Sequence, residues 1–138
     1  MADRVESVQY AHVTVPDRAG SGEVVLAALA DADLNMHAYL GFPAGKGKAQ
    51  LDIVPEDMSE LRRLAKGQGW NLSKPKACLR VTGKDRPGAV EQTIAKLARA
   101  GINVTAAMAM HAGKGKYGMV IWVKPNDQAK AAKALGAR

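Results

Sequence analysis

The stretch KACLRVTGKDRPGAVEQTIAKLARAGINV (residues 76–104) contains the pattern that decides the fold. Its first part alternates apolar and polar side chains, which predicts a half-buried strand. After DRPG the apolar residues recur at helical spacing, and Pro87 suits the first helical position because its ring fixes φ and it lacks an N–H. Gly101 stands where a helix is expected to end, and the run that begins at Ile102 is typical of a second strand.

The same pattern occurs 68 positions earlier in the chain. Aligned without a gap, residues 8–54 and 76–122 share 18 identities in 47 positions. The chain therefore contains two copies of one unit, which we place at residues 1–74 and 75–138. Each copy lies near the lower size limit for independent folding, so we expect the two to share stability.

Each copy follows the order strand, helix, strand, strand, helix, and the first copy continues with a possible fourth strand. This order predicts an α+β fold of two ferredoxin-like βαββαβ units in tandem. The second copy ends at Arg138 with no obvious fourth strand, so that sheet edge stays open or is covered by another segment, for which the N-terminal run RVESVQYAHVTV is one candidate. The predicted strands are 8–15, 34–41, 49–54, 69–74, 76–83, 102–111 and 117–124, and the predicted helices are 22–31, 56–66, 87–100 and 126–135, with Asn126 as the N-cap of the last.

The pentapeptide AGKGK occurs at 44–48 and again at 112–116. Both copies fall between two predicted strands, where glycine supplies positive φ and lysine keeps the turn solvated. A phosphate-binding P-loop requires a different spacing, a Ser or Thr, and a position between a strand and a helix. We therefore interpret AGKGK as a hairpin tip.

Composition excludes several classes of protein. The 138 residues carry a formal net charge of +7, which permits contact with nucleic acid, anionic lipid or acidic metabolites without selecting among them. Cys78 is the only cysteine, so neither an internal disulfide nor a cysteine metal cage can form. The N-terminus lacks the apolar run of a secretory signal, and no stretch is long enough to span a membrane. We expect a soluble cytoplasmic protein without metal or cofactor.

The motif DRPG, followed by a helix and GIN, resembles the ACT domain, a small regulatory module of amino-acid metabolism. The resemblance covers nearly the whole chain as a tandem pair. In the first copy Ala19 replaces the proline, which leaves that loop less preset. Many ACT domains pair side by side and bind a free amino acid between the β1–α1 loop of one unit and the start of β2 of its neighbour. The residues that the resemblance selects are Asp85, Arg86, Pro87, Gly88, Ile102 and Asn103 in the second copy, and Asp17, Arg18, Ala19, Gly20, Leu34 and Asn35 in the first.

Physical chemistry supports that placement. The first turn of a helix offers unpaired N–H groups to a carboxylate, and Gly88 lets a ligand approach the backbone closely. Asn103 has both a donor and an acceptor for the two charged groups of an amino acid. The same residue types also serve a purely structural loop, since Asp caps helices and Gly makes turns.

Other reactive side chains do not form a recognisable site. His12, His37 and His111 occupy different repeat positions, and none has a second ligand at metal-binding spacing. Cys78 and His12 are predicted to share the sheet face opposite the helices, but no acid is placed to orient them for catalysis. We interpret them as ordinary face residues and expect no enzymatic activity.

Val120 and Trp122 lie on one face of their predicted strand, and the apolar residues Met119, Ile121 and Val123 lie on the other face. A strand that is apolar on both faces is usually covered on both, so we expect a partner subunit or the other copy to cover this patch. Because monomers seldom expose such patches, the sequence predicts at least a homodimer.

Three functions remain open at this point. The first is a regulatory, allosteric module that binds an amino acid and acts on a separate metabolic enzyme or regulator. The second is a basic nucleic-acid-binding protein, which the low aromatic content of 4% and the lack of an RNP1-like strand disfavour. The third is a structural subunit with no ligand.

Overall fold

The computed structural model describes residues 3–138, whose contacts divide the chain into two compact units. The N-terminal unit comprises residues 9–76, and the C-terminal unit comprises residues 77–138 together with 3–8.

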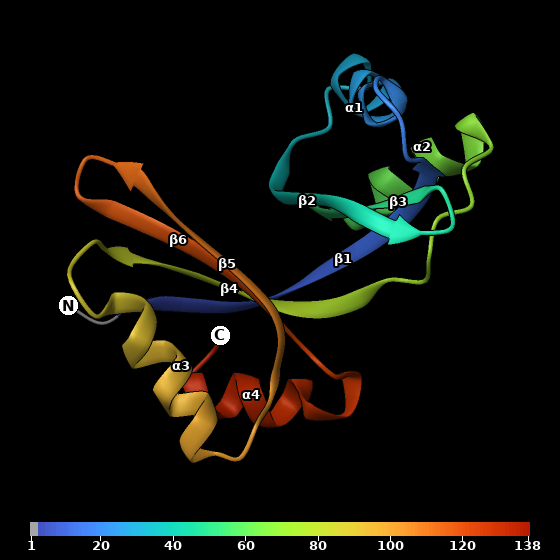
Figure 1. The fold of residues 1–138 in the computed structure, drawn as a ribbon. Helices are drawn as coiled ribbons and strands as arrows, with labels where there is room; N and C mark the ends of the chain where they lie inside the picture. The colour runs from blue at the N-terminus through green and yellow to red at the C-terminus, as the bar shows by residue number, and fades with distance from the viewer. Residues whose placement is uncertain (1–2) are drawn as a thin grey trace. The chain divides into compact units, whose positions relative to one another are not determined.

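The N-terminal unit contains a three-stranded arrangement in the order β2-β3-β1, with two helices (Figure 1). β2 and β3 form an antiparallel hairpin, and β3 also pairs antiparallel with β1, where Ala11 opposes Ile53. Val25, Leu29 and Leu61 from the helices pack with Val13 and Ile53 in one apolar core. The elements are β1 (Arg4–Pro16), α1 (Ser21–Asp31), β2 (Met36–Gly45), β3 (Lys48–Pro55) and α2 (Met58–Gln68), of which β1 begins in the other unit.

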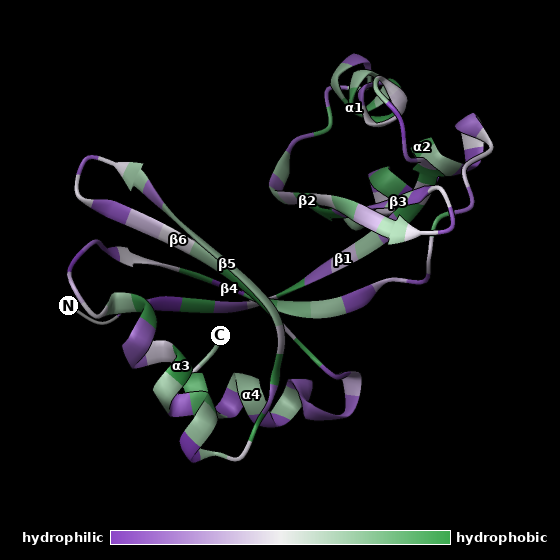
Figure 2. Cartoon of the chain, in the orientation of Figure 1, coloured by the Kyte–Doolittle hydropathy of each residue, from purple (hydrophilic) through white to green (hydrophobic). Residues whose placement is uncertain are grey.

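The C-terminal unit repeats this arrangement in the strand order β1-β4-β6-β5, with both helices on one side of the sheet (Figure 1). Leu79, Leu97, Ile121 and Leu135 meet in its core, and all four are at most 8% exposed. Hydrophilic and hydrophobic segments alternate along α3, as expected of a helix that covers a core on one side only (Figure 2). The elements are β4 (Lys76–Lys84), α3 (Ala89–Arg99), β5 (Val104–Gly113), β6 (Lys116–Val123), the 3-10 turn η1 (Pro125–Asp127) and α4 (Gln128–Leu135).

The N-terminal segment supplies the outer strand that the second copy lacks. Residues 4–8 of β1 lie beside β4, and Val5 joins the core of the C-terminal unit. Glu6 accepts a 2.8 Å hydrogen bond from Arg80, while the amide of Arg138 donates to the Val5 carbonyl at 3.0 Å. The N-terminal run is therefore the segment that covers this sheet edge.

The predicted fourth strand of the first copy, at 69–74, is wrong. The structure contains no strand between α2 and β4, although the Ser73 amide donates to the His12 carbonyl at 2.9 Å. The His12 amide bonds the Ser73 hydroxyl instead of a backbone carbonyl, and Pro75 has no N–H to continue a ladder. One backbone bond is too few to make a strand.

Three predicted helix ends also differ from the structure. Gly88 has φ +85° and is the N-cap of α3, so Pro87 precedes the helix rather than beginning it. α2 continues through Gly67 and ends at Gln68, before Gly69 in the left-handed conformation. Asn126 is no N-cap, because it lies inside the 3-10 turn that precedes α4.

Val120 and Trp122 are covered, as expected of a strand that is apolar on both faces, and they are only 9% and 5% exposed within the chain itself. No partner subunit is therefore needed to bury them. Cys78 is fully buried. The exposed large apolar side chains lie elsewhere, and β5 has two of them, Met108 at 49% and Met110 at 63%. Any apolar surface for self-association is therefore not the one that the sequence indicated.

The role of the N-terminal segment can be tested with Val5→Ala. Because Val5 is buried in the core of the C-terminal unit, removing two methyl groups should lower the free energy of unfolding by about 1.5–3 kcal/mol. Val24→Ala is the matched control, because Val24 is 66% exposed and should change stability by less than about 0.5 kcal/mol. Urea denaturation measures both, and equal small effects would show that residues 4–8 do not pack as described.

Candidate functional site

The β4–α3 loop is held by the neighbouring hairpin. The Asp85 amide donates to the Gly115 carbonyl at 2.8 Å, and the Ala89 amide closes a turn onto the Arg86 carbonyl at 3.2 Å. Gly88 has positive φ and allows the chain to turn into α3. These backbone bonds fix the loop independently of its side chains.

The same arrangement recurs in the N-terminal unit. There the Asp17 amide donates to the Gly47 carbonyl at 2.9 Å, and Gly20 has φ +89°. Gly47 and Gly115 are the second glycines of the two AGKGK copies, which form hairpin tips as predicted. Both central residues of each turn have positive φ, the geometry of a tight hairpin turn. The repeated pentapeptide thus anchors the repeated loop.

Arg86 is engaged within the protein. Its guanidinium lies 3.2 Å from a carboxylate oxygen of Asp3 and donates at 2.7 Å to Gln92 and to the Lys84 carbonyl. The Tyr117 hydroxyl donates to the same carboxylate at 2.6 Å. Burial opposes ionisation of Asp3, but the bonds from Tyr117 and Arg86 outweigh it and hold the pKa of Asp3 below its usual range. Arg86 therefore ties the N-terminal segment to the loop.

The same network acts on Tyr117. Burial and the hydrogen bond to Asp3 raise the pKa of the Tyr117 phenol. The hydroxyl therefore remains a donor across the neutral pH range, so the Asp3 carboxylate keeps both of its partners.

Asp85 does not belong to the Arg86 network, because its side chain contacts His111 instead. Its carboxylate lies 2.7 Å from Nδ1 of His111, near the end of β5, and both side chains are exposed. They line a cavity of about 320 Å³ beside the first turn of α3, together with the exposed apolar side chains of Val90 and Met110. The repeat did not single out His111 as a site residue, because the equivalent position 43 of the first copy is proline. The hairpin register could have found it, since the end of β5 adjoins the tip that bonds Asp85.

The structure does not bring Asn103 to this loop within one unit. Asn103 precedes β5, whose first paired residue Val104 opposes Val123, whereas Lys84 and Gly113 both oppose Lys116 at the other end of the sheet. A ligand that contacts both the loop and an equivalent asparagine would need a second unit or a second copy of the chain. That contact stays a prediction.

The remaining predicted residues fall into two groups. Ile102 and Leu34 are buried, at 5% and 7% exposure, and pack in the two cores. The backbone carbonyl of Asn35 accepts from Glu56 at 3.1 Å. The exposed residues are Asp17, Arg18, Ala19, Gly20 and Asn35 in the N-terminal unit, and Pro87, Gly88 and Asn103 in the C-terminal unit.

Two features that would indicate other functions are missing from residues 3–138. No group of three or more His, Cys, Asp or Glu side chains there is arranged to hold a metal ion. No helix in this part of the chain is both long and apolar enough to cross a membrane.

Solved structures share this fold. Protein BT0572 from Bacteroides thetaiotaomicron superposes with a TM-score of 0.78 at 15% identity, over 94% of this chain and 88% of that one. A structure of aspartokinase alpha and beta subunits gives a TM-score of 0.64 at 16% identity, over 98% of this chain and 95% of that one. The ligand-free regulatory subunit of aspartate kinase from Thermus thermophilus gives a TM-score of 0.62 at 15% identity, over 99% of this chain and 95% of that one.

These likenesses confirm the predicted fold class, which is an α+β fold of two ferredoxin-like units in tandem. No protein-family model matches the sequence, and neither does any curated protein. At such low identity the neighbours show the fold alone.

The Asp3 network makes a prediction about pH. Tyr117→Phe removes the hydroxyl donor to Asp3 and should lower the free energy of unfolding by about 1–2 kcal/mol at neutral pH. Because the folded-state pKa of Asp3 is depressed, its contribution is complete above its unfolded pKa and is lost as pH falls through the folded value. The difference between wild type and variant should therefore shrink below about pH 4.

Tyr39→Phe is the matched control, because it removes the same group from a tyrosine that is 38% exposed on β2. Its effect should be small at every pH. Denaturant titrations across the acid range test the pair, and a Tyr117→Phe effect that grows on acidification would contradict the network.

Proposed function

We propose that the chain is a non-catalytic regulatory module that binds a free amino acid and acts on a separate metabolic enzyme. Two of the structural neighbours are described as an aspartokinase and as a regulatory subunit of aspartate kinase, which supports a regulatory role at the level of fold. The observation that carries the proposal is the cavity where Asp85 and His111 meet the first turn of α3.

This cavity has the groups that an amino acid requires. The first turn of α3 offers backbone N–H groups and a partial positive charge to the ligand's carboxylate. The Asp85 carboxylate, of which one oxygen faces His111, can accept from the ligand's ammonium group. Val90 and Met110 provide an apolar wall for the ligand's side chain. The cavity has a volume of about 320 Å³, which lies at the lower end of the range for small-molecule sites.

The corresponding loop of the N-terminal unit is a weaker site. Asp17 and Gly20 have the same backbone arrangement as Asp85 and Gly88, but Pro43 stands where the other unit has His111. We therefore propose that the C-terminal unit binds the amino acid more tightly and fills first as the ligand concentration rises.

The ligand is tested by a thermal-shift panel of the twenty amino acids. A ligand at a hundredfold excess over its Kd should stabilise the protein by about 2.7 kcal/mol. Asp85→Asn keeps the shape of the side chain but removes its charge, and should weaken binding about tenfold or more. Gly88 is not a suitable test position, because its positive φ would strain any larger residue whether or not a ligand binds.

Asp127→Asn is the control for that experiment. Asp127 precedes α4, makes no side-chain capping bond and does not line the cavity, so the ligand-induced shift should be unchanged. The proposal fails if no amino acid raises the melting temperature at millimolar concentration, which would leave a structural subunit as the better interpretation. It also fails if both variants weaken binding equally.

We further propose that the chain forms a homodimer through β5. β5 pairs with β6 on one side, and no other strand of residues 3–138 pairs with it. It is ten residues long, has no Lys, Arg, Asp or Glu, and exposes Met108 and Met110. A long, uncharged edge strand presents free backbone groups to which a second chain can pair.

Light scattering tests the dimer against the 14.6 kDa mass of a monomer. Met108→Lys combined with Met110→Lys should shift the protein to monomers, because lysine on an edge strand opposes pairing between chains. Val24→Lys changes an apolar residue on α1 that is at least as exposed as the two methionines, and should leave the dimer intact. A wild-type protein that is monomeric at micromolar concentration would overturn this assembly.

A further inference from the structure

The net positive charge of the protein is confined to one unit. Residues 9–76 contain eight Lys and Arg and eight Asp and Glu, so the N-terminal unit is neutral. The rest of the chain contains twelve Lys and Arg against five Asp and Glu, which accounts for the whole charge of +7. Because the two copies share one fold, this asymmetry is not a requirement of the fold.

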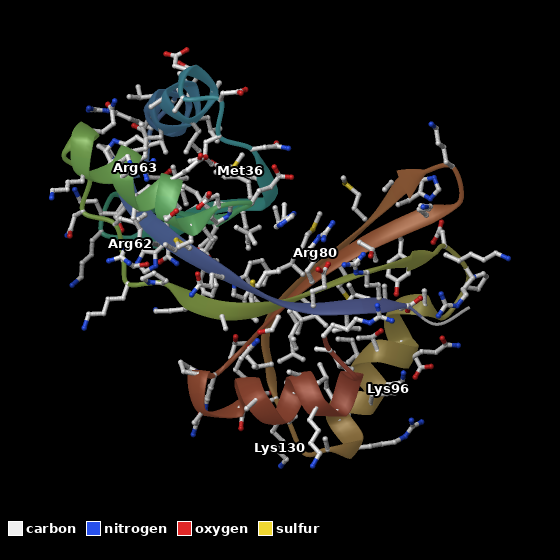
Figure 3. The ribbon with its side chains drawn as sticks, turned by 180° about the vertical axis from the view of Figure 1, so that it is seen from behind. Met36, Arg62, Arg63, Arg80, Lys96 and Lys130 are labelled. Atoms are coloured by element: carbon white, nitrogen blue, oxygen red, sulfur yellow. The ribbon has the colours of Figure 1, made fainter. Side chains whose placement is uncertain are left out.

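Much of this charge converges on one cavity of the C-terminal unit, with a volume of about 970 Å³. The start of β1, the exposed side of α3 and the residues after α4 surround it, and Figure 3 labels Lys96 on α3. Six cationic and two acidic side chains line it, which are Arg4, Lys84, Arg86, Lys96, Arg99 and Arg138 with Asp3 and Glu91.

The acidic side chains offset only part of this charge. The Asp3 carboxylate is bonded to Arg86 and Tyr117 and is near enough to Lys96 for their charges to attract, while Arg4 is ion-paired with Glu6. Within residues 3–138, no carboxylate lies within ion-pair distance of Lys84, Lys96 or Arg99.

Two of these cations lie close together in the last turn of α3. Lys96 and Arg99 are three residues apart, so they lie on neighbouring positions of the helix surface, where like charges repel. A concave wall in which cations outnumber carboxylates concentrates positive potential and attracts anions. A multivalent anion in the cavity would relieve this repulsion by bonding several cations at once.

We propose that this cavity binds a small ligand with several phosphate groups. Lys84, Lys96 and Arg99 are the side chains that would contact its oxygens, while Arg86 stays bonded to Asp3 and shapes the wall. No aromatic side chain lines the cavity, so it lacks the stacking platform on which proteins hold the bases of single-stranded nucleic acid. Its concave shape and volume suit a compact ligand.

This site is separate from the proposed amino-acid site and does not rest on it. Asp85 and His111 line the smaller cavity only, whereas Lys84, Lys96 and Arg99 line the larger one only. Arg86 and Glu91 line both cavities, which places the β4–α3 loop between them.

Tripolyphosphate is the probe, and titration calorimetry on the full chain is the measurement. We expect one tripolyphosphate per chain, with affinity that falls as salt is raised from about 50 to about 200 mM. Inorganic phosphate should bind about tenfold more weakly or worse, because it reaches fewer cations. Lys96→Gln combined with Arg99→Gln should weaken tripolyphosphate binding at least about tenfold, and glutamine preserves the helix.

The matched control is Lys130→Gln combined with Lys133→Gln. Lys130 and Lys133 lie on α4 in the same unit and do not line the cavity (Figure 3 labels Lys130). Their substitution removes the same amount of charge as the α3 double variant. Binding should change less than about twofold, since only the distant field is altered. Lys84→Gln, outside the helix, should weaken binding as well, so the test does not depend on the folding of one helix variant.

Three results would overturn the proposal. The first is no binding of tripolyphosphate at millimolar concentration. The second is equal weakening by the α3 and α4 double variants, which would indicate general charge attraction. The third is tighter binding of a DNA or RNA oligonucleotide than of tripolyphosphate with loss in the α4 variant, which would indicate a nucleic-acid surface.

Discussion

The backbone pairing of residues 4–8 beside β4 is the constraint on which the C-terminal unit depends. Without it, β4 would present a row of unpaired N–H and C=O groups at the edge of the sheet. The pairing places Val5 in the core and Glu6 beside Arg80. It also brings Asp3 to Arg86 and Tyr117, and Arg4 to the wall of the large cavity. The site of this unit is therefore built partly from the opposite end of the chain.

A second constraint is shared by both units, namely the bond between the loop and the hairpin tip. Asp17 and Asp85 each donate a backbone amide to the second glycine of an AGKGK tip. Because this bond uses only backbone atoms and positive φ, it leaves the loop side chains free to differ. Asp85 faces His111, while Asp17 lies in a unit with Pro43 at the equivalent position. Two units with one backbone plan can therefore have different surface chemistry, as their charges of zero and +7 illustrate.

Several features could be predicted from the sequence because they depend on local physical chemistry. The alternation of residues 76–83 and the spacing of Ile94 and Leu97 specify a strand and a helix wherever the segment lies. The glycines of AGKGK specify a tight turn in the same way. Because the same pattern recurs 68 positions later, the two copies are expected to adopt the same fold. These features were enough to predict the tandem ferredoxin-like plan and the β4–α3 loop, which contains Asp85 and Gly88.

Other features were decided only by tertiary structure, because they join residues far apart in the chain. α3 begins at Ala89 and not at Pro87, because its N-cap Gly88 has a positive φ that belongs to a loop fixed by Gly115. Trp122 is buried, although its strand pattern alone could not show what surrounds it. His111 reaches Asp85, and Arg86 reaches Asp3, across 26 and 83 positions. The sequence by itself determined the repeated unit and its turns, since these arise from contacts between near neighbours. Only the tertiary structure decided which strand completes the C-terminal unit and which cations share a cavity, because a linear pattern contains no information about which distant side chains meet.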